Sequence, residues 1–185
     1  MRRAWLAATA FAAAILLAGV AGAQTPPPEP EGYREDAYRA PVPATLKGAT
    51  VIDTAKAFDL WRAKTAVFID ALPHAPRPEG LPKNAVWREQ PREDIPGSLW
   101  LPDTGYGALS DATQLYLEKG LTKATGGDKR KPLVFYCLAN CWMSWNAAKR
   151  AMTMGYSSVY WYPQGTDGWA AAKHPLAENR PEPRD

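Results

Sequence analysis

The stretch Pro132-Leu-Val-Phe-Tyr-Cys137-Leu-Ala-Asn-Cys141-Trp-Met-Ser-Trp-Asn-Ala-Ala-Lys-Arg-Ala151 decides the fold, and it holds both cysteines of the 185-residue chain. Its first part is an apolar run that predicts a buried strand, and its second part has the spacing of a helix that ends before Gly155. Backbone N–H groups converge where a strand turns into a helix, and the helix adds partial positive charge, so a cysteine there is favoured as thiolate. We therefore expect a thiol site at Cys137 and Cys141.

Strands and helices are predicted to alternate on both sides of this stretch. Continuous apolar strands are typical of a parallel sheet that is buried on both faces, so we expect an α/β domain with a mostly parallel central sheet. Gly120 is predicted to end or break one helix. The predicted strands are residues 49–52, 66–72, 99–101, 133–136 and 158–162, and the predicted helices begin at Asp53, at Ser110, after Cys141 and at Thr166.

Asp70 ends one of these strands, as Cys137 follows another. Ligands of parallel α/β sheets bind at the carboxyl ends of the strands, so both residues are candidates for one site. We expect Asp70 to be a catalytic-site residue that orders the cysteine loop by accepting hydrogen bonds or acts on protons. A turn or helix-cap aspartate is the alternative. The loop over residues 73–91 contains five prolines, and a loop of this length is typically functional or disordered.

Both ends of the chain are predicted to lie outside the folded domain. Residues 1–23 have two arginines, an alanine-rich apolar run and an Ala-Gly-Ala site, which predict a signal peptide cleaved after Ala23 and export to the periplasm without a stable membrane anchor. Residues 24–48 are predicted to be a proline-rich linker and N-terminal extension. Residues 177–185 are predicted to be a disordered tail.

The charge balance argues against one class of partner. The whole chain has a net charge of +3, and removing the two leader arginines from 22 basic residues leaves 20 against 19 acidic residues. Such a balance is not that of an electrostatic nucleic-acid binder, so no nucleic acid is expected as a partner.

Four segments, taken in order, resemble the motifs of a rhodanese-like domain over residues 49–176. They are Phe68-Ile-Asp70, Asp94-Ile-Pro-Gly-Ser98, Val134-Phe-Tyr-Cys137 and Gln164-Gly-Thr-Asp-Gly-Trp169. The resemblance implies a sheet flanked by helices on both faces and sulfurtransferase-type chemistry. Active rhodaneses usually carry an arginine or another polar residue at the position of Trp142 and an arginine at that of Leu72. Cationic help for an anionic donor such as thiosulfate is thus reduced here.

A narrower resemblance rests on Cys137-Leu-Ala-Asn-Cys141-Trp142, on Tyr160-Trp-Tyr-Pro163 and on the leader. These segments are similar to those of the exported pyrroloquinoline quinone (PQQ)-dependent catabolism-associated CXXCW-motif protein family. That resemblance implies an association with a periplasmic PQQ-dependent dehydrogenase system and alcohol oxidation. It does not imply that this chain binds PQQ directly, and no resident cofactor is expected.

The expected chemistry uses a small sulfur or thiol substrate. Cys137 is predicted to be the nucleophile and Cys141 the resolving thiol, with a structural disulfide as the alternative. A disulfide between Cys137 and Cys141 would close a very small ring, which constrains the unfolded chain little and so stabilises the fold little. This favours a reversible disulfide or a metal site. The loop that would bind the substrate or an anion comprises Leu138, Ala139, Asn140, Trp142 and Met143.

Two other functions remain open. Two thiolates with Met143, or with His74 or His174, would suit Cu(I), so the chain could be a copper-binding or delivery module. A non-catalytic accessory protein for the dehydrogenase would use the proline-rich loop that begins at Pro73.

Overall fold

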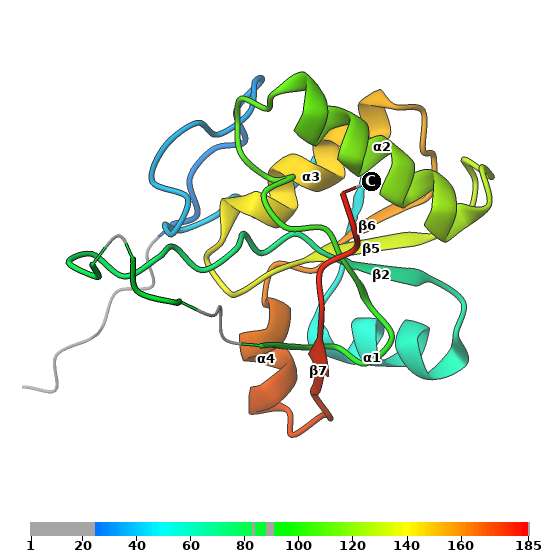
Figure 1. The fold of residues 1–185 in the computed structure, drawn as a ribbon. Helices are drawn as coiled ribbons and strands as arrows, with labels where there is room; N and C mark the ends of the chain where they lie inside the picture. Colours follow the sequence, from blue (N-terminus) through cyan, green and yellow to red (C-terminus); the bar gives the residue numbers. More distant parts are fainter. Residues whose placement is uncertain (1–24, 83, 88–90, 185) are drawn as a thin grey trace, which may run out of the picture.

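The computed structural model describes residues 25–82, 84–87 and 91–184 (Figure 1). The leader expected at residues 1–23 lies outside this part of the chain. None of the helices in the described part has the length and apolar character needed to cross a bilayer. In chain order the elements are β1 (Thr50–Val51), α1 (Thr54–Ala63), β2 (Val67–Asp70), β3 (Arg92–Asp94), β4 (Leu99–Trp100), α2 (Asp111–Thr125), β5 (Leu133–Tyr136), α3 (Trp142–Thr153), β6 (Val159–Trp161), α4 (Gly165–Ala171) and β7 (Ala177–Asn179).

Five of the strands form a parallel sheet in the order β1-β6-β5-β2-β4. Every neighbouring pair is parallel, and Phe135 of the central strand β5 is in register with Ile69 of β2 and Trp161 of β6. All four residues of β5 are buried, as its continuous apolar run predicts. The α/β class and the mostly parallel sheet are confirmed.

Helices cover both faces of this sheet, which confirms the layered arrangement. Helices α2 and α3 lie on one face, and α1 and α4 lie on the other (Figure 1). Trp145 and Trp161 anchor the apolar cluster under α2 and α3, and Trp169 anchors the cluster under α1 and α4. These tryptophans are fully buried and form the core.

Polar side chains cap the N-termini of helices α1 and α2. Asp53 accepts a hydrogen bond from the Lys56 amide at the start of α1, and Ser110 accepts one from the Thr113 amide at the start of α2. The prediction that Gly120 ends or breaks α2 is wrong, because the helix continues to Thr125. A Cβ at Gly120 would lie 2.6 Å from a methyl carbon of Leu101, so glycine here allows close packing.

The prediction of a disordered tail is wrong for residues 177–184. Strand β7 pairs antiparallel with β3, and neither strand was predicted. Beyond β7, the Glu182 amide donates to the Trp100 carbonyl at 3.0 Å, and Arg184 pairs with Asp103 at 2.9 Å. These segments are polar, so hydrogen bonds and ion pairs fix them and they show no apolar periodicity.

The linker prediction is wrong for residues 29–46, which we call the strap. The strap packs along α3, and Leu46 lies in the core cluster. Indole N–H groups of α3 donate to strap carbonyls, from Trp142 to Pro41 and from Trp145 to Thr45. Because α3 side chains satisfy the strap backbone, its order does not require an apolar pattern of its own.

Asn146 of α3 is predicted to hold the strap in place. Its amide group is fully buried, accepts from the Arg34 N–H at 3.0 Å, and donates to the carbonyls of Arg34 and Gly105 at 2.8 Å each. Asn146→Ala would leave these backbone groups unpaired, which should lower the free energy of unfolding by roughly 2–4 kcal/mol. Urea unfolding measures the loss, and the exposed Asn84→Ala serves as control. Equal stability of the two variants would contradict this role.

Candidate active site at the ends of β2 and β5

Cys137 and Cys141 form a disulfide across the loop that joins β5 to α3. Cys137 directly follows β5, and Cys141 is the residue before the first turn of α3. Asn140 turns the loop back with φ of +50°, a left-handed conformation that asparagine tolerates better than most residues. The two Cα atoms are 6.5 Å apart, and neither cysteine is a free thiol.

The disulfide is enclosed by side chains from several segments. Both cysteines are at most 1% exposed, and Met143 completes their apolar cluster. Tyr38 of the strap and Tyr106 cover the cluster. Their rings are in edge-to-face contact, with the ring centroids 5.2 Å apart. Leu72 and Leu138 also pack against it. A reagent therefore reaches the sulfur atoms only after one of these covers moves.

Two of the loop amides that were predicted to bind an anion already have protein acceptors. The Ala139 N–H donates to the Asp167 carboxylate at 3.0 Å, and the Trp142 N–H donates to the Tyr38 carbonyl at 2.9 Å. The Trp142 side chain packs against Trp145, away from solvent. The loop is thus ordered by the strap and by α4, and these amides are occupied.

The strap also contacts the main chain of Cys141. Arg39 and Cys141 form an isolated antiparallel bridge, next to the hydrogen bond between Trp142 and Tyr38. The Cys141 side of the disulfide is consequently covered by backbone.

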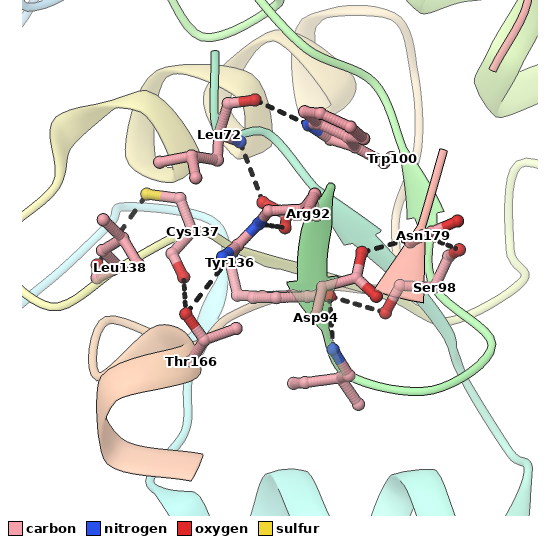
Figure 2. Close-up of polar contacts among 12 residues, drawn as sticks. Leu72, Arg92, Asp94, Ser98, Trp100, Tyr136, Cys137, Leu138, Thr166 and Asn179 are labelled. Atoms are coloured by element: carbon pink, nitrogen blue, oxygen red, sulfur yellow. Dashed lines mark hydrogen bonds and ion pairs between the residues drawn. The ribbon is translucent and has the colours of Figure 1, made fainter. Parts of the chain in front are cut away.

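Asp70 reaches the cysteine loop through Arg92 and Thr166. The buried Asp70 carboxylate accepts from the Leu72 N–H at 2.8 Å and from Arg92 Nε at 2.7 Å. Arg92 Nη2 donates to Thr166 Oγ1 at 3.2 Å, and both the amide and the hydroxyl of Thr166 donate to the Cys137 carbonyl (Figure 2). One chain of polar contacts therefore joins the ends of β2 and β5 to the start of α4.

The start of α4 approaches Cys137 closely because a glycine lies there. Gly165 has φ of +53°, and a Cβ at this position would lie 2.4 Å from the Cys137 carbonyl oxygen. Glycine is therefore required for Thr166 to reach that carbonyl.

Sequence reasoning missed Arg92. Leu72 stands at the position where active rhodaneses usually carry an arginine. In this structure Arg92 of β3 supplies the guanidinium instead. Arg92 lies 22 residues after Asp70 in the chain, within an unpredicted strand. The only sequence signal was its place two residues before the Asp94-Ile-Pro-Gly-Ser98 segment. Its charge is balanced by Asp70 at 2.7 Å.

Burial raises the pKa of two carboxyl groups beside this arginine. For Asp70, burial outweighs the opposing effects of the Arg92 charge and the Leu72 hydrogen bond. For Asp94, burial raises the pKa to about 7, although a hydrogen bond from Asn179 lowers it, and the charge of Asp70 raises it further. Asp94 therefore changes its protonation near neutral pH.

A pocket of about 440 Å³ opens next to the cysteine loop. Leu138 and Thr166 line it on the loop side, and Trp100 and Leu176 contribute apolar surface. Leu72 and Leu138 both line the pocket and also pack against the cluster of Cys137, Cys141 and Met143. Figure 2 shows these two leucines together with Cys137. These two leucines therefore form the wall between the pocket and the sulfur atoms.

The two histidines proposed as copper ligands lie in different surroundings. His174 stacks on Phe58 on the α1–α4 side of the sheet, with the ring centroids 4.0 Å apart. The centroid of the His74 ring lies 5.5 Å from that of Trp100. Within the described residues, no group of three or more histidine, cysteine, aspartate or glutamate side chains could hold a metal ion.

The chain belongs to the rhodanese-like domain family, whose model matches residues 47–172. The strap and β7 lie outside the matched residues. A comparison with curated proteins finds no match.

Several solved structures are similar to this chain at low sequence identity. The polysulfide-sulfur transferase of Wolinella succinogenes is 16% identical, with 72% of this chain and 82% of that chain covered and a TM-score of 0.45. A Rhodopseudomonas palustris protein named as a possible tyrosine phosphatase is 23% identical, with 70% and 85% covered and a TM-score of 0.45. EanB, in a persulfide form with ergothioneine, is 18% identical, with 77% of this chain but 34% of that chain covered and a TM-score of 0.50.

The raised pKa of Asp94 predicts a pH-dependent difference in stability. Between about pH 4 and pH 7 the unfolded chain loses the Asp94 proton while the folded chain keeps it, so this group destabilises the fold as pH rises. Asp94→Asn removes the effect. The variant should gain stability over the wild type by at most about 1.4 kcal/mol per pH unit in this window, and the difference should level off above about pH 7.

Urea midpoints between pH 4 and pH 8 measure this difference. The control is Asp59→Asn, which makes the same substitution at an exposed position of α1. A pH-independent difference for Asp94→Asn would show that the buried carboxyl titrates normally.

Proposed function

We propose that this rhodanese-like domain performs thiol–disulfide or persulfide chemistry on a small sulfur or thiol substrate, with Cys137 and Cys141 as the reacting pair. The observation that carries the proposal is the disulfide between them, at the carboxyl end of β5 and the start of α3. A sulfurtransferase-like or thiol–disulfide oxidoreductase activity fits this pair. Membership of the rhodanese-like family supports a sulfurtransferase-like activity, and the presence of Cys141 beside Cys137 supports a thiol–disulfide oxidoreductase activity.

Cys137 is the sulfur that exchanges with the substrate. Its carbonyl is held by the pocket residue Thr166, and its neighbour Leu138 lines the pocket. The main chain of Cys141, in contrast, is covered by the strap. An incoming thiolate that enters from the pocket side therefore meets Cys137 first.

The thiol–disulfide exchange takes place in two steps. A substrate thiolate attacks Cys137 Sγ, forms a mixed disulfide, and displaces Cys141 as a thiolate. A second thiol then attacks the substrate sulfur, releases Cys137 as a thiolate, and leaves as part of an organic disulfide. Cys141 lies at the N-terminus of α3, whose partial positive charge stabilises its thiolate as the leaving group.

The persulfide route runs in the opposite redox direction: it starts from the reduced pair and ends in the disulfide. The Cys137 thiolate attacks the outer sulfur of an organic persulfide and releases the organic thiolate. Cys141 then attacks Cys137 Sγ, forms the disulfide, and releases hydrosulfide. The thiol exchange described above then restores the reduced pair, with two substrate thiols as the reductant and an organic disulfide as the product.

The proposed setting is the periplasm, where disulfides persist. The family resemblance supports service to a periplasmic PQQ-dependent dehydrogenase system in alcohol oxidation, without direct binding of PQQ. This setting rests on the leader and on the Cys137–Trp142 motif.

Single-cysteine variants separate the two roles. With an organic persulfide as donor, Cys141→Ser should retain a sulfur adduct of about 32 Da on Cys137, because the resolving thiol is absent. Cys137→Ser should gain none, and the wild type should return to the disulfide. Intact-mass spectrometry before and after reductant measures the adducts, with the double serine variant as control. Equal adducts on the two single variants would refute the assignment.

Cu(I) binding by the reduced pair is the second candidate, and one observation favours it. Met143 belongs to the same buried cluster as both cysteines, so reduction would place a thioether in the same cluster as two thiols. The module would then be a carrier rather than an enzyme.

Met143→Leu tests this candidate while both thiols remain. If the protein carries copper, the reduced wild type should hold Cu(I) against a chelator of moderate affinity, and Met143→Leu should hold it about tenfold more weakly. Met152→Leu, on the same helix and outside this cluster, is the control. Failure of the reduced wild type to compete with the chelator would reject copper handling.

A further inference from the structure

The pocket beside Leu138 carries an inference about the substrate, which rests on the thiol chemistry proposed above. We propose that the pocket selects uncharged or cationic organic thiols over anionic ones, and that these thiols reach Cys137 through the wall formed by Leu72 and Leu138.

The pocket has the size and lining of a site for a small organic molecule. Its volume of about 440 Å³ falls within the range of about 300–1,000 Å³ that is usual for ligand sites. Leu72, Trp100, Leu138 and Leu176 supply apolar side chains, and alanines and prolines complete much of the lining. This lining favours the organic portion of a thiol over a fully hydrated inorganic anion.

The charges at the pocket disfavour anions. Arg92 is the one cationic side chain among the described lining residues, and its charge is balanced by Asp70 at 2.7 Å. Its Nη2 is also engaged by Thr166. Glu93 and Asp167 line the same pocket, so its described walls carry uncompensated negative charge. A thiol that bears a carboxylate is repelled, and one that bears an ammonium group is attracted.

On the pocket side, the side chains of Leu72 and Leu138 separate the pocket from the cluster that holds the disulfide. Leu72 and Leu138 line the pocket and pack against the sulfur cluster, so rotation of their side chains would connect the two. On the Cys141 side, the strap is joined to the loop by backbone contacts at Arg39 and Tyr38. Opening that side requires hydrogen bonds to break.

Three small thiols that differ in charge test the selection. Cysteamine, 2-mercaptoethanol and 3-mercaptopropionate are allowed to reduce the native disulfide, and alkylated thiols are counted by intact mass. Each rate is divided by the rate of the same thiol with an uncharged organic disulfide, which removes differences in intrinsic nucleophilicity. The normalised rate should be about tenfold higher for cysteamine than for 3-mercaptopropionate.

Two pairs of matched variants assign the selection to this pocket. Glu93→Gln should lower the ratio between the two charged thiols about threefold, whereas Glu118→Gln on the exposed side of α2 should not change it. Ala170→Trp should fill the pocket and slow all three thiols, and Ala171→Trp, one position further on α4 and outside the lining, should not.

The outcomes separate this inference from the function on which it rests. Equal normalised rates for the three thiols, or unchanged rates in Ala170→Trp, would overturn the inference and leave the exchange chemistry standing. A native disulfide that resists all three thiols, but reacts once the chain is unfolded in urea, would overturn the exchange chemistry as well.

Discussion

The buried pair of Asp70 and Arg92 is the interaction on which the site depends. A carboxylate that is fully removed from water is costly unless charge and hydrogen bonds offset the burial. The Arg92 guanidinium and the Leu72 amide offset part of this cost, although burial still raises the pKa of Asp70. Arg92 then extends to Thr166, and Thr166 holds the carbonyl of Cys137. The pair therefore sets the position of the cysteine loop relative to the sheet and α4.

The strap sets the other boundary of the site. It supplies the carbonyl that binds the first amide of α3 and a tyrosine ring over the disulfide. The acceptors that occupy Ala139 and Trp142 belong to α4 and the strap, respectively. The site is thus arranged around a closed disulfide, and some of its loop amides donate hydrogen bonds to acceptors within the protein. This arrangement favours exchange at sulfur over the storage of an anionic sulfur species.

The features that could be predicted from the sequence share a local signal. Continuous apolar runs fixed the positions of β2 and β5, and Asp53 and Ser110 marked the helix starts. The residues Asp70 and Cys137 were found because each follows such a strand. Arg92 and Asn146 were missed because their partners lie 22 and 112 residues away and no periodic pattern marks a polar contact. The order of the strap and of β7 was missed for the same reason, since backbone hydrogen bonds fix both.

The most direct test of the account is the redox equilibrium of the native wild-type protein in glutathione buffers. Thiols are alkylated at each ratio of reduced to oxidised glutathione and counted by intact mass, while near-ultraviolet circular dichroism reports the fold. The account predicts a reversible two-electron transition in which both cysteines become alkylated and the native tertiary signal is kept. A disulfide that is reduced only as the tertiary signal is lost would contradict it, because the pair would then be a structural disulfide.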